Sequence, residues 1–339
     1  MQMSAMETAE TRPADERAMD RVLTLELVRV TERAAIAAAL LRGRGDEKAA
    51  DQAAVDAMRT ELNRLRIRGR IVIGEGERDE APMLYIGEEV GSGDGPKVDI
   101  ALDPLEGTTI CAKNLPNSLA VIAITRRGNL LYAPDVYMEK VAVGPGYPDS
   151  FLDIDEPPDE TIRRIAEHKG VKRRNITACV LDRPRHAKLI EAIRSTDAAI
   201  RLIGDGDVAG IIHTTAPDET GIDVYMGIGG APEGVLAAAA LRCIGGQMCG
   251  RLVLDSEEKR ARAERMGIAD PARIYRTEDM ATGDVLFAAT GVTDGSMLQG
   301  VKFDNHLASP HTVVTRSPTG TQRWVRAIHR FTEKYGLID

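Results

Sequence analysis

The sequence predicts an α/β fold in which two α/β regions pack closely together. Short apolar runs, such as residues 98–102, have the length and composition of buried strands. They alternate with segments such as residues 22–41, whose apolar residues recur at helical spacing. Acidic, glycine-rich or arginine-rich turns follow several of the predicted strands, and open α/β sheets place their ligands at such strand ends. We therefore expect layered sheets and helices with a site in the crevice between the two regions.

The composition is that of a globular protein and excludes several classes of function. Of the 339 residues, 43% are hydrophobic and 28% are charged, which allows a large core. The net charge of −8 and the aromatic content of 4% disfavour nucleic-acid binding. The chain has no apolar run of membrane-spanning length, and the segment from Met1 to Arg21 lacks the apolar stretch of a signal peptide. The four cysteines form no CxxC pair, so we expect a cytoplasmic protein with reduced thiols and no membrane partner.

The chain is predicted to begin with a tail and two helices. Residues 1–20 are polar and low in aromatic residues, which predicts a flexible tail. A first helix covers residues 22–41, and Asp46 is a suitable N-cap for a second helix that reaches about residue 65. The spacer at residues 144–158 is rich in Gly, Pro and Asp, which indicates a boundary. The predicted organisation is therefore a tail (1–20), an N-terminal region (21–150) and a C-terminal region (151–339).

The stretch around Asp103 organises the chain, because a predicted buried strand runs directly into acidic and hydroxyl residues there. Pro104 fixes one backbone angle and removes a donor, so the strand is expected to stop at this point. Glu106 returns a second carboxylate, Gly107 allows close approach of the backbone to a ligand, and Thr108 adds a hydroxyl. Two carboxylates beside a hydroxyl suit a hard divalent cation that holds a phosphate oxygen. The alternative interpretation is an acidic turn with a proline stop.

A second acidic strand end is predicted at Glu75. Residues 70–73 form a short strand, and the glycines on both sides of Glu75 let its carboxylate turn inward. The alternative is a glycine-rich surface turn with solvated glutamates, and the role of Glu77 stays undecided. Because a similar acidic strand end follows nearby, we interpret Glu75 as a metal ligand. Further along, residues 119–125 and 130–132 flank a turn and predict a β-hairpin.

A β-α-β pattern opens the C-terminal region, with strands at residues 176–181 and 199–203 and a helix at 187–194. Arg183 and Arg185 follow its first strand and are good fork-shaped donors for a phosphate. A salt-bridged loop is the alternative interpretation of these arginines.

Other charged residues lie at the same two strand ends. His186, which lies among cations, is predicted to be a helix-terminal or phosphate-side residue rather than a metal ligand. Asp205 and Asp207 follow the second strand, just before a predicted helix.

Residues 227–234 hold four glycines between a predicted strand and a predicted helix. A dinucleotide fingerprint is excluded because Pro232 stands where its third glycine is required, and a P-loop is excluded because Val235 follows Gly234. What remains is a helix N-terminus that carries Glu233. Its free N–H groups can hold an anion while Glu233 reaches a metal. The remaining predicted elements are strands at residues 252–254, 285–290 and 313–314, and helices at residues 256–266 and 322–335.

At residues 103–108, Asp-Pro-Leu-Glu-Gly-Thr, the chain resembles the lithium-sensitive, metal-dependent phosphatase superfamily. That superfamily includes inositol monophosphatases and fructose-1,6-bisphosphatases. Further matching segments occur in the order seen in class II fructose-1,6-bisphosphatases, at residues 71–77, 133–140, 183–186, 205–209 and 227–234. The similarity runs from about residue 24 to about residue 329.

The resemblance implies a layered αβαβα sugar-phosphatase fold and assigns roles to individual residues. The metal ligands that it implies are Asp51, Glu75, Asp103, Glu106 and Glu233. Five carboxylates in one pocket would repel one another, and two divalent ions, Mg²⁺ or Mn²⁺, would remove that penalty. The implied catalytic residues are Thr108, Asp51 and Glu75, which orient and deprotonate a water. The implied substrate contacts are Glu106, Gly107, Thr108, Tyr137, Arg183, Pro184, Arg185, Asp205, Gly206, Asp207 and Gly230.

The expected function is hydrolysis of the 1-phosphate of fructose 1,6-bisphosphate. An alternative is a dual enzyme that also hydrolyses sedoheptulose 1,7-bisphosphate, because residues 202–207 and 240–246 resemble the photosynthetic bacterial enzymes with both activities. The paired arginines disfavour an inositol monophosphatase, since they imply a second phosphate. Retention of every acidic position and of Thr108 disfavours a non-catalytic sugar-phosphate sensor. The resemblance also implies a homo-oligomer, either a dimer or a tetramer.

Overall fold

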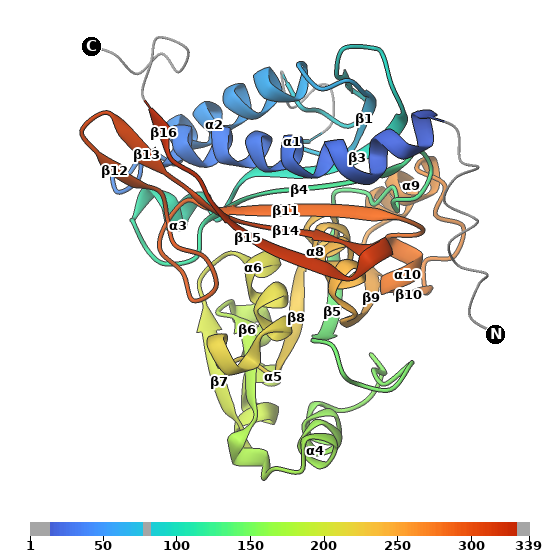
Figure 1. Cartoon of the computed structure of the whole chain (residues 1–339). Helices are drawn as coiled ribbons and strands as arrows, with labels where there is room; N and C mark the ends of the chain where they lie inside the picture. The colour runs from blue at the N-terminus through green and yellow to red at the C-terminus, as the bar shows by residue number, and fades with distance from the viewer. Residues whose placement is uncertain (1–13, 77–82, 331–339) are drawn as a thin grey trace, which may run out of the picture.

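The computed structural model describes residues 14–76 and 83–330, which form two large β-sheets, a small third sheet and helices in alternating layers (Figure 1). Helices cover the outer face of each large sheet, and a further group of helices fills the space between the sheets. The predicted α/β class with a layered αβαβα architecture is therefore confirmed.

The first large sheet has seven strands in the order β15-β14-β11-β4-β3-β1-β2. Only β1 and β3 pair in parallel, and all other neighbours are antiparallel. Its strands are β1 (Arg68–Ile73), β2 (Glu89–Val90), β3 (Lys97–Glu106), β4 (Leu119–Arg126), β11 (Val285–Gly291), β14 (His311–Arg316) and β15 (Thr321–Arg326).

The second large sheet has six strands in the order β10-β9-β5-β8-β6-β7, and β6 pairs in parallel with both β7 and β8. Its strands are β5 (Tyr137–Val143), β6 (Thr177–Leu181), β7 (Ala199–Ile203), β8 (Val224–Gly230), β9 (Gln247–Val253) and β10 (Ile274–Arg276). The small sheet contains β12 (Lys302–Asp304), β13 (Leu307–Ser309) and β16 (His329–Arg330).

The helices divide among three layers. Outside the seven-stranded sheet lie α1 (Ala14–Ala39) and α2 (Glu47–Leu62), and outside the six-stranded sheet lie α4 (Pro158–Lys169) and α5 (Ala187–Arg194). Between the sheets lie α6 (Asp207–Ile212), α8 (Ala231–Ile244) and α10 (Thr277–Met280). The remaining helices are α3 (Thr108–Ala112), α7 (Pro217–Thr220) and α9 (Glu257–Arg265).

Strand β4 shows why these layers form. Its side chains alternate between the two faces of the sheet, and both faces are apolar. Val121 and Ala123 pack into the core shared with α8, while Ile122 and Ile124 pack into the core beneath α1 and α2. Both apolar faces of such a strand must be shielded from water, so helices are required on both sides of the sheet.

Pro104 does not end the strand that carries Asp103, contrary to the prediction. Strand β3 continues to Glu106, and its register with β4 shifts between Asp103 and Glu106. The proline stands at this irregularity, where it removes no ladder hydrogen bond, which is a position that sheets tolerate. The irregularity also brings Asp103 and Glu106 to one end of the same strand.

Two predicted elements are wrong because their partners are distant in the sequence. The hairpin does not form: β4 pairs with β3 and β11, and Leu130 makes only an isolated bridge to Ala281. The predicted final helix is replaced by β15 and β16, and its last part, at residues 331–335, lies outside the described residues. The predicted strand at residues 313–314 is confirmed as part of β14.

The predicted boundary at residue 150 does not separate the two sheets. The seven-stranded sheet takes β11, β14 and β15 from the C-terminal region, and the six-stranded sheet takes β5 from the N-terminal region. Helix α1 begins at Ala14, inside the predicted tail, and the earlier part of that tail lies outside the described part of the chain. The Asp46 N-cap is confirmed, because its carboxylate accepts a hydrogen bond from Ala49 N–H.

Replacing Ile122 by alanine tests this layered core. The Ile122 side chain is fully buried between β3 and β11, so Ile122→Ala should lower the free energy of unfolding by about 2–5 kcal/mol. The measurement is urea unfolding followed by circular dichroism. The matched control is Leu25→Ala on α1, a position that is 59% exposed, where a change within about 0.5 kcal/mol is expected. Equal losses at both positions would contradict the assigned core.

Candidate metal centre and active site

A cavity of about 360 Å³ opens where strand ends and helix starts from both large sheets meet. The carboxyl ends of β1 and β3, the side of α2 and the first turn of α8 all contribute to its wall. Side chains from segments that are far apart in the sequence are thus brought together. The predicted site residues that line it are Asp51, Glu75, Asp103, Glu106, Gly107, Thr108, Asp205 and Glu233.

Gly107 allows the turn from β3 into α3. Its φ of +79° lies in the left-handed region, and a Cβ at this position would lie 2.9 Å from Ile110 Cδ1. Thr108 is the first residue of α3, so its hydroxyl and backbone N–H stand directly beside Glu106 at the cavity wall.

Glu106 links the two halves of the site. Its side chain is buried, and Oε1 accepts a hydrogen bond of 2.9 Å from Val208 N–H at the start of α6. The bond joins the end of the seven-stranded sheet to the helix layer that covers the six-stranded sheet. Asp205 and Asp207, which flank this helix start, are held near the first sheet in this way.

Glu75 is placed by a close backbone approach. Glu75 N–H donates to Leu84 O at 3.1 Å, and a Cβ on Gly74 would lie 2.0 Å from the same carbonyl oxygen. Only glycine therefore fits at residue 74, as the flanking-glycine argument predicts. Glu77, which was undecided, lies outside the described residues.

Glu233 enters the cavity from the first turn of α8 and has an unsatisfied oxygen. Its Oε2 atom is buried and has no hydrogen-bond partner. Gly230 makes room for the carboxylate, because a Cβ there would lie 1.8 Å from Oε2. A buried carboxylate oxygen without a donor is costly unless a cation or a proton satisfies it.

The carboxylates of the cavity share raised pKa values. Burial, opposed in part by hydrogen bonding to Glu106, raises the pKa of Asp103 to about 6. Burial and then repulsion from Asp207 raise the pKa of Glu233 to about 7. Burial and the neighbouring Asp103 also raise the pKa values of Glu75 and Glu106 well above their ordinary range. The cavity therefore favours protons or other cations.

The donor set fits a hard divalent ion, since every candidate ligand is a carboxylate. Within the described ranges, no three acidic, histidine or cysteine side chains are already arranged around one point as a metal cage. Asp103 and Glu106 instead accept hydrogen bonds from the backbone N–H groups of Leu105 and Val208, respectively. A divalent ion would reduce the repulsion between the carboxylates and satisfy the free Glu233 oxygen.

Lys140 is a residue of this site that the sequence analysis did not single out. It projects from β5 with no exposed side-chain surface, and Nζ donates to the Asp207 carboxylate and, at 2.8 Å, to Gly230 O. Burial raises the pKa of Glu233, and the positive charge of Lys140 opposes that shift. One signal was available: a lysine within a short strand whose buried face is otherwise apolar, at Met138 and Ala142.

Further predicted substrate contacts lie around the last residues of β8 and the start of α6. The Arg185 guanidinium stacks on the Tyr137 ring at 4.6 Å. Burial raises the pKa of Asp205, and Arg183, which precedes the short helical turn Pro184–His186, opposes that shift. Gly206 caps α6 with a φ of +83°. Asp135, which was not predicted, also lines the cavity.

The clustered carboxylates beside a threonine, between two stacked sheets, are suited to metal-dependent hydrolysis of a phosphoric monoester. The family model for "Bacterial fructose-1,6-bisphosphatase, glpX-encoded" matches residues 21–329. The chain belongs to this family. The resemblance and enzyme class predicted from the sequence are therefore confirmed, and divalent-metal dependence follows with them.

Curated relatives support the same family over almost the whole chain. One from Synechococcus sp. (strain JA-2-3B'a(2-13)) is 46% identical over 336 residues, which cover 92% of this chain and 96% of the relative. One from Trichodesmium erythraeum (strain IMS101) is 44% identical over 340 residues, covering 93% and 98%. Both are named D-fructose 1,6-bisphosphatase class 2/sedoheptulose 1,7-bisphosphatase.

The suppressor protein suhB from Bartonella henselae, a solved structure, overlaps with 57% of this chain and 72% of its own at a TM-score of 0.32 and 15% identity. In the described part of the chain, no helix combines the length and the apolarity needed to cross a membrane.

Metal binding and pH should be linked in this protein. Because folding raises the pKa values of Asp103 and Glu233, these groups contribute stability that is complete below about pH 4 and is lost as the pH rises through 6 to 7. Without metal, the melting temperature should therefore be lower at pH 8 than at pH 5. Mn²⁺ at about one hundred times its pH 8 dissociation constant should raise the melting temperature by about 4 °C at pH 8, and the same concentration should raise it by less at pH 5.

Thermal unfolding in EDTA and in Mn²⁺ measures both effects, and Glu233→Gln should weaken the pH dependence. An equal metal-induced rise at both pH values would contradict the link.

Lys140→Met should destabilise the protein by about 3–5 kcal/mol, because Asp207 would lose its buried partner. Chemical unfolding gives the value, and adding Asp207→Asn should recover part of the loss. Lys259→Met removes an exposed ion pair with Asp255 and should cost no more than about 1 kcal/mol. A similar small loss at Lys140 would show that this buried charge pair has no structural role.

Proposed function

We propose that this chain hydrolyses the 1-phosphate of fructose 1,6-bisphosphate, with two divalent ions, Mg²⁺ or Mn²⁺. The observation that carries the proposal is the gathering of Asp51, Glu75, Asp103, Glu106 and Glu233 around one cavity beside Thr108. Family membership supports the phosphatase chemistry, and the arginines beyond β8 support a substrate with a second phosphate.

The five carboxylates would hold the ions, which supply positive charge to the reacting phosphate and an activated water. The Thr108 hydroxyl orients that water, and Asp51 or Glu75 accepts its proton. These carboxylates are suited to the task because burial raises their pKa values. The Gly107 and Thr108 N–H groups, at the start of α3, hold phosphate oxygens.

The remaining predicted residues bind the rest of the substrate. Arg183 and Arg185 hold the second phosphate, and Tyr137 supports the Arg185 guanidinium. Asp205 contacts sugar hydroxyls. Asp207 is assigned the same role in the proposal, with Lys140 holding one side of its carboxylate. Pro184, Gly206 and Gly230 contribute backbone at the same end of the site.

Sedoheptulose 1,7-bisphosphate is a second candidate substrate, because the relatives from Synechococcus and Trichodesmium are named for both activities. The two sugars differ by one hydroxymethylene unit, and a pocket discriminates weakly against such a difference. A parallel assay on the two bisphosphates decides the preference.

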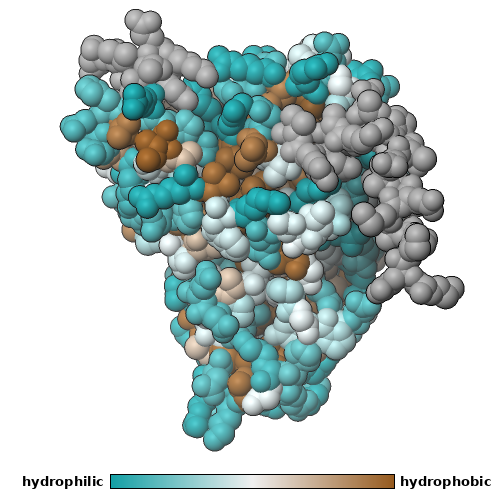
Figure 2. All heavy atoms as spheres, viewed as in Figure 1, coloured by the Kyte–Doolittle hydropathy of each residue, from teal (hydrophilic) through white to brown (hydrophobic). Residues whose placement is uncertain are grey.

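We also propose a cytoplasmic homo-oligomer, a dimer or a tetramer. All four cysteines are free and buried, as expected in a reducing compartment. Apolar patches surrounded by polar surface lie over the small sheet (Figure 2), and Trp324 and Ile328 nearby in the chain are 50% and 69% exposed. Sedimentation analysis gives the assembly state, and a purely monomeric protein would contradict this part of the proposal.

Glu106→Gln tests the reaction. The amide oxygen of the introduced side chain can still accept from Val208 N–H, so the fold should be retained, while metal-dependent phosphate release should fall on the order of 100-fold. The assay is phosphate release from fructose 1,6-bisphosphate with Mg²⁺ or Mn²⁺. Glu89→Gln is the matched control, because its side chain is 79% exposed on a different strand and activity should stay unchanged. Full activity of Glu106→Gln would refute the assigned role.

A further inference from the structure

His186 is a buried titratable side chain that the proposed reaction leaves without a role. Only 1% of its surface is exposed, and it lies at the end of the turn Pro184–His186, directly before α5. Its neighbours in the sequence are the two substrate arginines, Arg183 and Arg185. The ring therefore stands between the substrate-binding loop and the six-stranded sheet.

Both ring nitrogens of His186 have fixed backbone partners. Nδ1 lies 2.7 Å from Leu181 O, and Nε2 lies 2.8 Å from Ile228 N. Because the carbonyl can only accept and the amide can only donate, Nδ1 carries the proton and Nε2 is the acceptor. Burial, and then the nearby arginines, lower the pKa of His186, which favours this neutral ring.

Ile228 continues the connection to Arg185. Its carbonyl oxygen accepts from Arg185 Nε at 3.0 Å and from Arg185 Nη2 at 2.8 Å. The same guanidinium lies over the Tyr137 ring, with its Cζ atom 4.6 Å from the ring centroid. A continuous path of contacts thus runs from His186 through the backbone of Ile228 to the group that is proposed to bind the second phosphate.

The strand pairing explains why side chains are needed here. Strand β8 pairs with β6 only at two positions, Ala178 with Val224 and Cys179 with Tyr225. Beyond them, Ile228 has no backbone partner on the β6 side within the described ladder, and the side chains of His186 and Arg185 take the place of a strand. Gly227 makes room for the ring: its φ is +152°, and a Cβ there would lie 3.2 Å from His186 Nε2.

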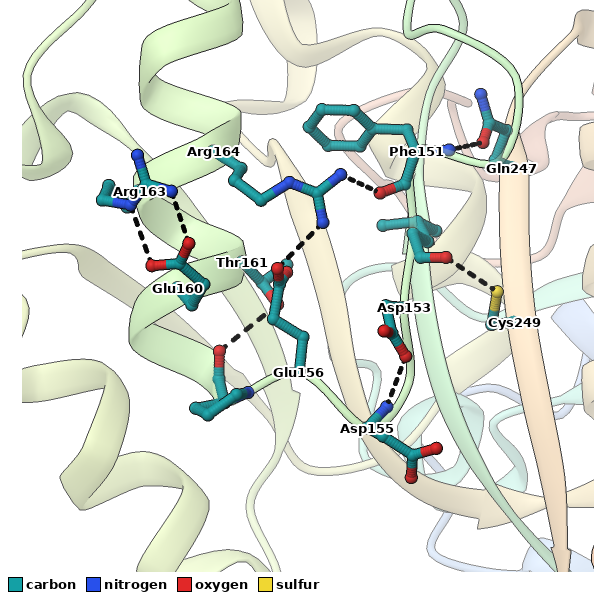
Figure 3. A network of polar contacts seen from close by, with 12 residues as sticks. Phe151, Asp153, Asp155, Glu156, Glu160, Thr161, Arg163, Arg164, Gln247 and Cys249 are labelled. Atoms are coloured by element: carbon teal, nitrogen blue, oxygen red, sulfur yellow. Dashed lines mark hydrogen bonds and ion pairs between the residues drawn. The ribbon is translucent and has the colours of Figure 1, made fainter.

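Carboxylates share a second cavity with Arg185. This cavity, of about 190 Å³, is lined by Arg185 and His186 together with Glu139, Asp153 and Glu156. Figure 3 shows Glu156 held by Arg164 and Thr161, and Asp153 accepting from the backbone of Asp155. These carboxylates have their own partners while Arg185 is fixed on Ile228. A released Arg185 side chain could turn toward them instead.

We propose that His186 is a positioning residue that fixes Arg185 through Ile228 and so sets the affinity for the second phosphate of the substrate. The proposal rests on the proposed function, in which Arg185 binds that phosphate. It assigns His186 no contact with substrate or metal. Its effect should appear with bisphosphate substrates and vanish when Arg185 is absent.

The test compares His186→Phe, which keeps a ring but removes both hydrogen bonds, with His186→Gln, whose amide can restore one. His186→Phe should raise KM for fructose 1,6-bisphosphate about tenfold, the equivalent of one hydrogen bond to a charged group, and change kcat less than twofold. The KM of His186→Gln should lie between those of wild type and His186→Phe. Hydrolysis of p-nitrophenyl phosphate, which has a single phosphate, should stay within twofold of wild type.

A double-mutant cycle separates positioning from general stability. In an Arg185→Gln background, His186→Phe should raise KM no further, whereas additive effects would overturn the proposal. His213→Phe removes another buried imidazole and should lower stability without changing KM. Positioning through Arg185 would also be refuted if His186→Phe lost equal activity on fructose 1,6-bisphosphate and on p-nitrophenyl phosphate. An unchanged KM for the bisphosphate in a folded His186→Phe variant would refute it too.

A readout without turnover distinguishes failure of this inference from failure of the proposed function. The Arg185 Nε–H signal in NMR, assigned by its loss in Arg185→Gln, should exchange slowly with water in wild type and rapidly in His186→Phe. If wild type hydrolyses p-nitrophenyl phosphate with metal but not the bisphosphate, the proposed substrate is wrong. Slow exchange retained in His186→Phe would show that the positioning inference itself is wrong.

Discussion

The mutual repulsion of buried carboxylates is the constraint on which this structure depends. Glu75, Asp103, Glu106 and Glu233 face one cavity, where burial raises all four pKa values and the charge of Asp103 raises the other three further. A cluster of ionised carboxylates in a buried cavity is unfavourable unless positive charge lies nearby. The chain supplies part of that charge through Lys140, and divalent ions would supply the remainder. We therefore expect folding and metal binding to be coupled in this protein.

The layered fold meets this constraint by bringing the ends of elements together. The ends of strands and the starts of helices have free backbone N–H and C=O groups. Side chains at these positions can face a ligand without leaving paired backbone groups of the sheet unsatisfied. Glu106 shows the principle, because one carboxylate ends β3 and also accepts from the start of α6. The two sheets are therefore connected at the site itself, and the cavity lies at the junction rather than within either sheet.

Local patterns predicted most of the site, and long-range pairing explains what they missed. Glycines and apolar runs mark the strand ends and the helix start that carry Glu75, Asp103 and Glu233, and these residues line one cavity; their metal-binding roles came from the family resemblance and stay predictions. The hairpin failed because the partner of β4 is β11, which comes much later in the sequence. Lys140 was missed since its partners, Asp207 and Gly230, become neighbours only in the folded sheet. The boundary at residue 150 does not fall between the sheets for the same reason: the seven-stranded sheet joins strands from residues 68–126 and 285–326, and the six-stranded sheet is formed by the stretch between them.

Lys140 and His186 are buried basic side chains with different partners, and this difference fits a bisphosphate substrate. Lys140 is paired with Asp207 on the acidic side, where a positive charge lowers the cost of the carboxylates. His186 lies beside two arginines, where burial and those charges keep its ring neutral and available as an acceptor. In the proposed function, the acidic end of the crevice holds the cations, and Arg185, fixed on Ile228, lies at the other end. We therefore expect a substrate with a phosphate at each end to place its reacting phosphate on the acidic side.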